Sequence, residues 1–352
     1  MFLLYFKDNI YQYDKTMKSK DPKLVIQTTP FLRQGMTTPQ AMLDVIYALI
    51  PITIASVWFF GVSVLLVLMA SIAGTVLTEW VFASKPNRSS LLDGSAVLTG
   101  LLLGLTLPPS LPLWMAFVGG VIGMGLGKTM WGGLGNNLFN PALLGRAFLL
   151  ANFPIAMTTW APQPQGLFNL YPSNFAMPFM RADVDAVTEA TPLGLMKFQH
   201  QDTPIVDLII GNIPGSFGET CGLLIILGGI YLILRRSIDW RVPVAIIGTV
   251  VIFTSILFMF DSSRFPDPLF AVFSGGLLLG AFFMATDPVT SPLTPKGTWL
   301  FGIGIGIIIV LIRVFGGFPE GTMYAILLMN ATVPLIERYT QPRAFGRGGT
   351  KI

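Results

Sequence analysis

Charged residues are scarce in this sequence: only 11% of its 352 residues are Asp, Glu, Lys or Arg, whereas 53% are hydrophobic. Soluble domains carry about 25% charged residues, so the composition excludes an ordinary soluble protein. A polytopic membrane protein accounts for it, because charges are costly in lipid and apolar stretches of about 20 residues cross the hydrocarbon core. The first predicted partner is therefore the lipid bilayer.

Cysteine and histidine are almost absent. The single cysteine, Cys221, excludes an internal disulfide and a cysteine-ligated cluster within this chain, and the single histidine, His200, argues against a histidine-based metal site. No metal site is predicted. The net charge of +4 reflects basic residues in particular loops, so no nucleic-acid partner is predicted. Residues 1–23 are rich in lysine and too short of apolar length for a cleavable signal peptide.

Long apolar segments fill most of the remaining sequence and predict an all-α polytopic integral membrane protein with about ten transmembrane helices. The first two adjoin, with a turn expected near Gly61. The predicted helices are 41–60, 61–83, 95–107, 111–130, 140–157, 218–234, 242–260, 268–285, 298–315 and 321–339.

The distribution of basic residues predicts the topology. If the N-terminus is cytoplasmic, cytoplasmic loops and ends hold seventeen of the 22 Lys and Arg residues, as the positive-inside rule requires. The polar interruption between the two halves then lies outside the cytoplasm. The predicted organisation is a cytoplasmic N-terminal extension (1–40), a first transmembrane half (41–157), an extracytoplasmic loop (158–217), a second transmembrane half (218–340) and a cytoplasmic tail (341–352).

The two halves also contain similar stretches of sequence. The similar pairs are Ser95–Gly104 with Ser274–Gly280, and Gly132–Pro141 with Gly316–Pro334. Under the predicted topology the two members of each pair lie on opposite sides of the membrane. This indicates an inverted repeat, in which functional sites form where broken helices meet. The alternative explanation is that small residues recur in any membrane protein.

Glycine-rich stretches have a plainer interpretation. Gly127-Lys128-Thr129 resembles the end of a nucleotide-phosphate loop, but Ile122 stands where that loop needs its first glycine, and no strand precedes it. The spaced glycines before it, and those at Gly302–Gly306, are typical of close helix packing in membranes.

The polar loop contains the pattern Asp185-x-x-Thr188-x-Ala190-Thr191, which arises by chance on the order of once in a hundred chains of this length. One interpretation is a helix start, with Thr191 as N-cap and Pro192 as the first helical residue. A phosphate on the Thr191 hydroxyl is compatible with it, because the amide groups and dipole at a helix N-terminus favour an anion.

This motif resembles the flavin-attachment site of the RnfD/NqrB family, in which a separate flavin transferase links FMN to threonine through a phosphoester. The resemblance extends over most of the chain, with a longer basic N-terminal extension as its one departure. The matching stretches are Gly132–Ala142, Thr188–Leu193, Gly280–Val289, Phe315–Gly321 and Asn330–Leu335.

The resemblance implies a urea-transporter-like fold and a subunit of the Rnf complex in the bacterial inner membrane. Such a subunit passes electrons through covalent FMN at Thr191 in ferredoxin:NAD oxidoreduction coupled to Na⁺ or H⁺ movement. Iron–sulfur and nucleotide sites would belong to other Rnf subunits. Asp185 and Thr188 would be recognition elements for the transferase on the extracytoplasmic side, and Ala190 is a further predicted cofactor-binding residue.

Other polar residues in or near the helices have two interpretations each. Asp287 either lines a cation path or ends a helix. Asn136 and Asn140, with Asn137, either bind a second, non-covalent flavin (riboflavin), as relatives are thought to do, or cap a turn. Asp44, Glu79, Arg146 and Arg313 lie nearer helix ends, where side chains can reach water, and structural roles are favoured for them.

Two other functions remain open from the sequence. An inverted-repeat solute transporter or channel without flavin would use the polar loop as a lid. A passive scaffold for neighbouring subunits is the third hypothesis. Covalent flavin on Thr191 would distinguish the flavin-carrying Rnf subunit from both the transporter and the scaffold.

Overall fold

The computed structural model describes residues 37–342 except 83–92, 163–165, 167, 169, 179–188, 220 and 263–264. All of these belong to one structural unit, which begins at Thr37. The described residues form helices and turns, without a strand. Two residues of the predicted attachment motif, Asp185 and Thr188, lie outside the described residues.

Proline and glycine determine where the helices of the first half begin and end. Gly61 separates the first two helices with φ of 76°, a conformation that side chains disfavour. Pro154 lacks a backbone N–H, so the predicted helix 140–157 divides into two. The helices are α2 (Thr38–Phe60), α3 (Ser63–Phe82), α4 (Ser95–Leu105), α5 (Leu113–Gly127), α6 (Pro141–Asn152) and α7 (Pro154–Thr158).

The second half contains a longer break within one of its predicted helices. The predicted helix 268–285 is divided at Ser274–Gly276, where Gly275 adopts φ of 66°. The elements are α10 (Gly222–Leu234), α11 (Arg241–Phe260), α12 (Pro268–Phe273), α13 (Leu277–Leu279), the π-helical turn η6 (Gly280–Met284), α14 (Pro295–Phe315) and α15 (Thr322–Thr340).

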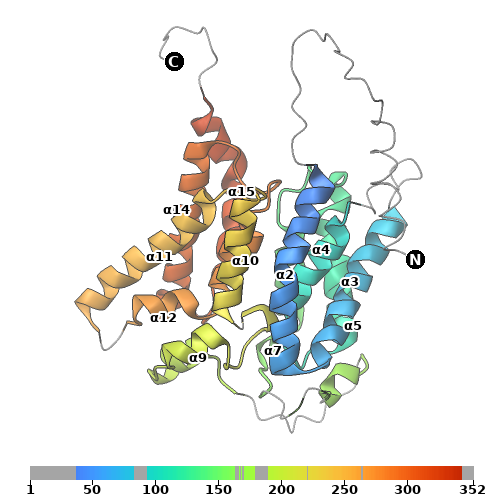
Figure 1. Ribbon diagram of the computed structural model, residues 1–352, viewed down its shortest axis with the longest axis horizontal. Helices are drawn as coiled ribbons and strands as arrows, with labels where there is room; N and C mark the ends of the chain where they lie inside the picture. The colour runs from blue at the N-terminus through green and yellow to red at the C-terminus, as the bar shows by residue number, and fades with distance from the viewer. Residues whose placement is uncertain are drawn as a thin grey trace, which may run out of the picture. The chain divides into compact units, whose positions relative to one another are not determined.

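Short elements make up the segment between the halves. They are η3 (Pro172–Phe175), α8 (Pro192–Gly194), the π-helical turn η4 (Leu195–Gln199), α9 (Ile205–Ile210) and η5 (Phe217–Glu219). In Figure 1, α9 lies at the end of the unit opposite to that at which α2 begins.

Among the described residues, five helices are long and apolar enough to cross a membrane: Thr38–Phe60, Ser63–Phe82, Leu113–Trp131, Arg241–Phe260 and Pro295–Phe315. Two shorter helices, α4 and α10, are also apolar. Each of the ten predicted segments contains helix, so the prediction of an all-helical membrane protein is confirmed.

Small residues allow the helices to approach closely, as the glycine spacing predicts. A Cβ atom on Gly123 of α5 would lie 2.6 Å from the carbonyl oxygen of Pro141 on α6, and one on Gly302 of α14 would lie 3.0 Å from that of Val242 on α11. Helix α3 packs on α5 in the first half, as α11 packs on α14 in the second. The halves meet where α2 contacts α10 (Figure 1) and where α6 contacts α15.

Candidate functional site

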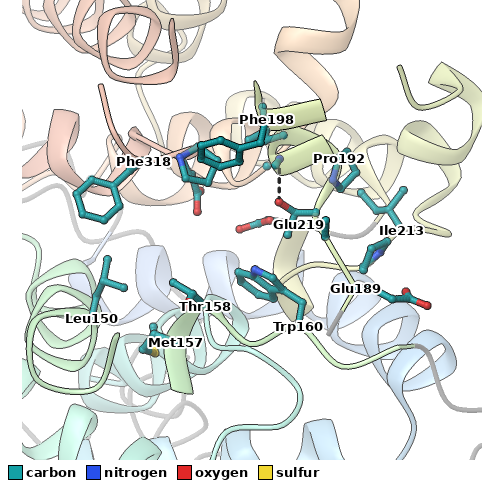
Figure 2. Close-up of a pocket in the computed structure, with 18 of the residues that line it drawn as sticks. Leu150, Met157, Thr158, Trp160, Glu189, Pro192, Phe198, Ile213, Glu219 and Phe318 are labelled. Atoms are coloured by element: carbon teal, nitrogen blue, oxygen red, sulfur yellow. Dashed lines mark hydrogen bonds between the residues drawn. The ribbon is translucent and has the colours of Figure 1, made fainter. Parts of the chain in front are cut away.

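A cavity of about 440 Å³ lies beside Thr191, and we call it the Thr191 cavity. Its walls come from both halves and from the segment between them. Large apolar and aromatic side chains dominate its lining, including Leu150, Met157, Trp160, Phe198, Phe318 and Tyr324. In Figure 2, Glu219 lies between Phe198 on one side and Trp160 on the other. A volume of this size falls in the range of ligand pockets, about 300–1,000 Å³.

Thr191 begins a short helical run on the rim of this cavity. It is the N-cap of α8, with Pro192 as the first helical residue, and its Oγ1 accepts a hydrogen bond of 3.2 Å from the amide of Gly194. Threonine and proline in this order favour a helix start, so the capping interpretation is confirmed. Ala190 is exposed and also lines the cavity.

A charged cluster forms one wall of the Thr191 cavity. Arg146 of α6 donates from Nη2 to Glu320 Oε2 at 2.8 Å, and the same Nη2 lies 3.9 Å from Glu219 Oε1. The other oxygen of Glu320 accepts from the amide of Gly276 at 3.0 Å. Burial, and then the charge of Glu320, raise the pKa of the Glu219 carboxyl, which lies in the turn before α10. Arg146 therefore joins the two halves at the cavity wall.

Two further cations donate hydrogen bonds to backbone carbonyl groups near this wall. Arg313 of α14 donates to the carbonyl oxygens of Ala271 and Ser274, at 2.5 and 2.9 Å, where α12 ends. Lys197 donates to the carbonyls of Gly316 and Phe318, at 2.6 and 2.9 Å, just beyond the end of α14. Burial lowers the pKa of the Lys197 ammonium. Cations at helix C-termini stabilise the unpaired carbonyls there.

A second cavity, about 70 Å³ in volume, lies beside Lys128, and we call it the Lys128 cavity. Lys128 is buried with only 2% of its surface exposed. Its Nζ lies 2.5 Å from Glu79 Oε1 and 2.6 Å from Ser95 Oγ. Glu79 is buried and does not reach water, and its ion pair with Lys128 is the structural role expected of it. Asp44 is also buried, with Arg235 and Ser237 as partners.

The Lys128 cavity also contains Asn140 and Asp287. Asn140 caps α6, accepting from the amides of Ala142 and Leu143 at 3.0 and 3.3 Å, and its Nδ2 donates to the carbonyl of Met284 at 3.1 Å. Asp287 accepts from the amide of Val289 and the hydroxyl of Thr290 in the turn after η6. Burial raises the pKa of the Asp287 carboxyl.

The predicted site residues therefore divide between two places. Thr191 and Ala190 lie at the large cavity, Asn140 and Asp287 at the small one, and Asn136 is exposed and lines neither. Sequence reasoning missed Glu219 and Glu320. Their one sequence signal is that each is an isolated carboxylate beside an apolar helix.

Comparison with known proteins identifies the family. Residues 25–346 match the model of the NQR2, RnfD, RnfE family. The chain is 41% identical over 332 residues to the Clostridium ljungdahlii D subunit of a proton-translocating ferredoxin:NAD(+) oxidoreductase complex, covering 91% of this chain and 96% of that one. It is 37% identical over 336 residues to the Halorhodospira halophila D subunit of an ion-translocating oxidoreductase complex, covering 90% and 94%. The chain belongs to the NQR2, RnfD, RnfE family.

Proposed function

We propose that this chain is the membrane subunit of an ion-translocating ferredoxin:NAD oxidoreductase complex and that it carries FMN covalently on Thr191. The relatives named above are the D subunits of ion-translocating oxidoreductase complexes, and they align along nearly their whole length. The observation that carries the FMN proposal is the position of Thr191 on the rim of a cavity large enough for a ligand and lined by aromatic rings.

The residues around this cavity fit a flavin. Aromatic side chains stack well on planar rings, and Trp160, Phe198 and Phe318 would flank the isoalloxazine. The phosphate would sit at the start of the helical run Pro192–Gln199, where backbone amides favour an anion. Bound FMN supplies the electron-carrying chemistry, while the chain supplies placement and charge. Arg146 would place a positive charge beside the cofactor.

Other proteins complete the activity in this proposal. The sequence has one cysteine and no Rossmann fingerprint, so iron–sulfur centres and NAD would bind to other Rnf subunits. A flavin transferase would attach FMN during maturation, with Asp185 and Thr188 as its recognition elements. Ala190 and Glu189 are exposed beside Thr191, which suits access by a second protein.

We also propose the topology that the basic residues predict, with ten membrane spans in two inverted, urea-transporter-like halves in the bacterial inner membrane. The supporting observation is that helix pairs in the two halves correspond: α3 with α5 and α5 with α6, against α11 with α14 and α14 with α15. The segment 158–217 would be extracytoplasmic, and residues 1–40 and 341–352 cytoplasmic. The position of α9, opposite the start of α2, supports this (Figure 1).

The small cavity would serve the second flavin or the ion path. At about 70 Å³ it is far below the size of ligand pockets, so riboflavin would enter beside Asn140 only if the lining side chains moved. Asn136 would take part only through a larger movement, since it is exposed. Asp287, the proposed ion-path residue, lines this cavity.

Fluorescence of the denatured chain tests the covalent attachment. Wild-type protein from cells that contain the transferase should give a fluorescent band on a denaturing gel, and mass spectrometry should find FMN on the peptide that contains Thr191. Thr191→Ala should abolish both. Thr191→Asn is the sharper variant, because asparagine keeps the N-cap oxygen but has no hydroxyl to esterify. A folded, fluorescent Thr191→Asn chain would contradict the assignment, and a dark wild-type band would favour the flavin-free transporter.

A further inference from the structure

One carboxylate at the Thr191 cavity has a spare oxygen. Glu219 is only 7% exposed and lines the cavity, yet its Oε1 has no hydrogen-bond partner among the described residues. A buried charged oxygen without a hydrogen bond is costly. The free Oε1 of Glu219 therefore points to a function for this carboxylate, and the neighbouring charged groups indicate which one.

The charged groups around Glu219 are already engaged elsewhere. Arg146 makes its short contact, 2.8 Å, with Glu320, and lies 3.9 Å from Glu219. Glu320 also accepts from the Gly276 amide. Arg313 donates to two backbone carbonyls. Of the other titratable groups at the cavity, Glu189 is exposed and Tyr324 is a neutral phenol.

The two carboxylates that share Arg146 are thus unequal. Glu320 accepts hydrogen bonds from the guanidinium of Arg146 and from the amide of Gly276. Glu219 has the longer contact with Arg146 and the spare oxygen, so it is the carboxylate of the pair that is open to a proton. The arginines cannot respond to added negative charge, because they are already protonated.

We propose that Glu219 is the proton acceptor that compensates the negative charge entering the flavin pocket on reduction. This inference rests on the proposed attachment of FMN to Thr191. One electron, delivered by a redox carrier of a partner subunit, adds one negative charge to the pocket. One proton from water then binds the Glu219 carboxylate as a carboxylic acid, so the net charge of the pocket is unchanged. When the electron leaves, the proton returns to water.

The physical reason is electrostatic. A negative charge acts strongly on a neighbouring anion in a poorly solvated site, and a like charge disfavours the ionised form of a carboxyl group. The cavity brings Glu219 and the attachment residue Thr191 to the same space. Reduction would therefore raise the proton affinity of Glu219, the carboxylate with the spare oxygen.

Reduced-minus-oxidised infrared difference spectra of the whole complex test the proposal. Reduction should produce a carbonyl band of a protonated carboxyl group, which shifts in deuterated water. Glu219→Gln should remove that band, and Glu219→Asp should shift it. In Glu219→Gln the midpoint potential of the flavin should also become more positive and less dependent on pH, because the amide is neutral in both redox states. Asp202→Asn, which changes an exposed carboxylate in the loop before α9, should leave the band and the potential unchanged.

The outcomes separate this inference from the proposed function. A fluorescent wild-type band whose complex lacks the carboxyl signal would overturn the role of Glu219 and leave the flavin attachment in place. A band that persists unchanged in Glu219→Gln would overturn it equally. If Glu219→Gln fails to assemble, the shift in Glu219→Asp decides the matter. A wild-type chain without flavin would instead overturn the attachment itself.

Discussion

The two cavities differ in how their polar groups are satisfied. At the Lys128 cavity, Lys128 pairs with Glu79, and Asn140 uses both its amide oxygen and its nitrogen. At the Thr191 cavity, Glu219 has an oxygen without a hydrogen bond among the described residues, and the volume is about 440 Å³ against about 70 Å³. Buried polar groups that hydrogen-bond to one another stabilise helix packing, as at the Lys128 cavity. A larger cavity with a polar atom that lacks a partner, such as the Thr191 cavity, suits a ligand.

The comparison extends to two cations near helix ends. Lys128 directly follows α5, and Arg313 lies near the end of α14. Lys128 neutralises a carboxylate, while Arg313 binds the carbonyls where α12 breaks. Gly275, which lies in that break, and Glu320 both line the Thr191 cavity.

The largest expected effect is at the Lys128 cavity. Lys128→Met leaves the Glu79 carboxylate buried beside an apolar side chain, and breaking a buried ion pair in this way costs about 3–5 kcal/mol. The melting temperature of the purified protein in detergent should fall steeply. Lys128→Met combined with Glu79→Gln should recover part of the loss, because the amide carries no charge.

A matched control for that variant is Arg241→Met. Arg241 pairs with Asp239 at 3.1 Å, but both side chains are about one-third exposed, at 33% and 35%. Such surface pairs contribute about 0–1 kcal/mol. Equal effects of Lys128→Met and Arg241→Met would break the comparison, because the Lys128 cavity would then not depend on its ion pair.

The next prediction concerns the charged wall of the Thr191 cavity. A Cβ atom on Gly276 would lie 2.6 Å from Glu320 Oε1 and 3.3 Å from Glu219 Oε1. Gly276→Ala should therefore displace both carboxylates and destabilise the chain by about 1–3 kcal/mol, with a changed redox potential of the flavin. Gly248→Ala is the control, since a Cβ atom there meets nothing within 4 Å. A potential unchanged in Gly276→Ala would place the carboxylates outside the influence of the flavin.

A smaller effect is expected at Asn140. Asn140→Ala removes the N-cap of α6 and the bond to the Met284 carbonyl, which joins the halves. The expected loss is about 1–2 kcal/mol. Asn140→Ser should recover roughly half, because serine is a good N-cap but is too short to reach Met284. Thermal unfolding of the three proteins measures the difference, and equal melting temperatures for the alanine and serine variants would assign the whole effect to the bond between the halves.

The sequence predicts local features of this protein better than the pairing of distant charges. Thr191-Pro192 predicts a helix start, and the glycine spacing predicts close helix packing, because both depend on neighbouring residues. The break at Gly275 escapes such reasoning, since the apolar run continues across it. The wall made by Arg146, Glu219 and Glu320 depends on how the halves meet, which no local pattern specifies.

The smallest effect is predicted at Asp287, and its pH dependence decides between the two interpretations of that residue. Because burial raises the pKa of Asp287 above its ordinary value of 3.8, the folded chain binds this proton more tightly than the unfolded chain does. Stability from that proton is lost as pH rises through the folded pKa.

Asp287→Asn cannot titrate, so its melting temperature should rise relative to that of the wild type as the pH increases from about 4 to neutrality. At neutral pH the variant should be equally stable or more stable, by a few tenths to about 1 kcal/mol. A wild type that is the more stable protein at neutral pH only in sodium salts would show instead that the ionised carboxylate holds a cation. The Lys128 cavity would then belong with the Thr191 cavity, as a site with a spare polar group.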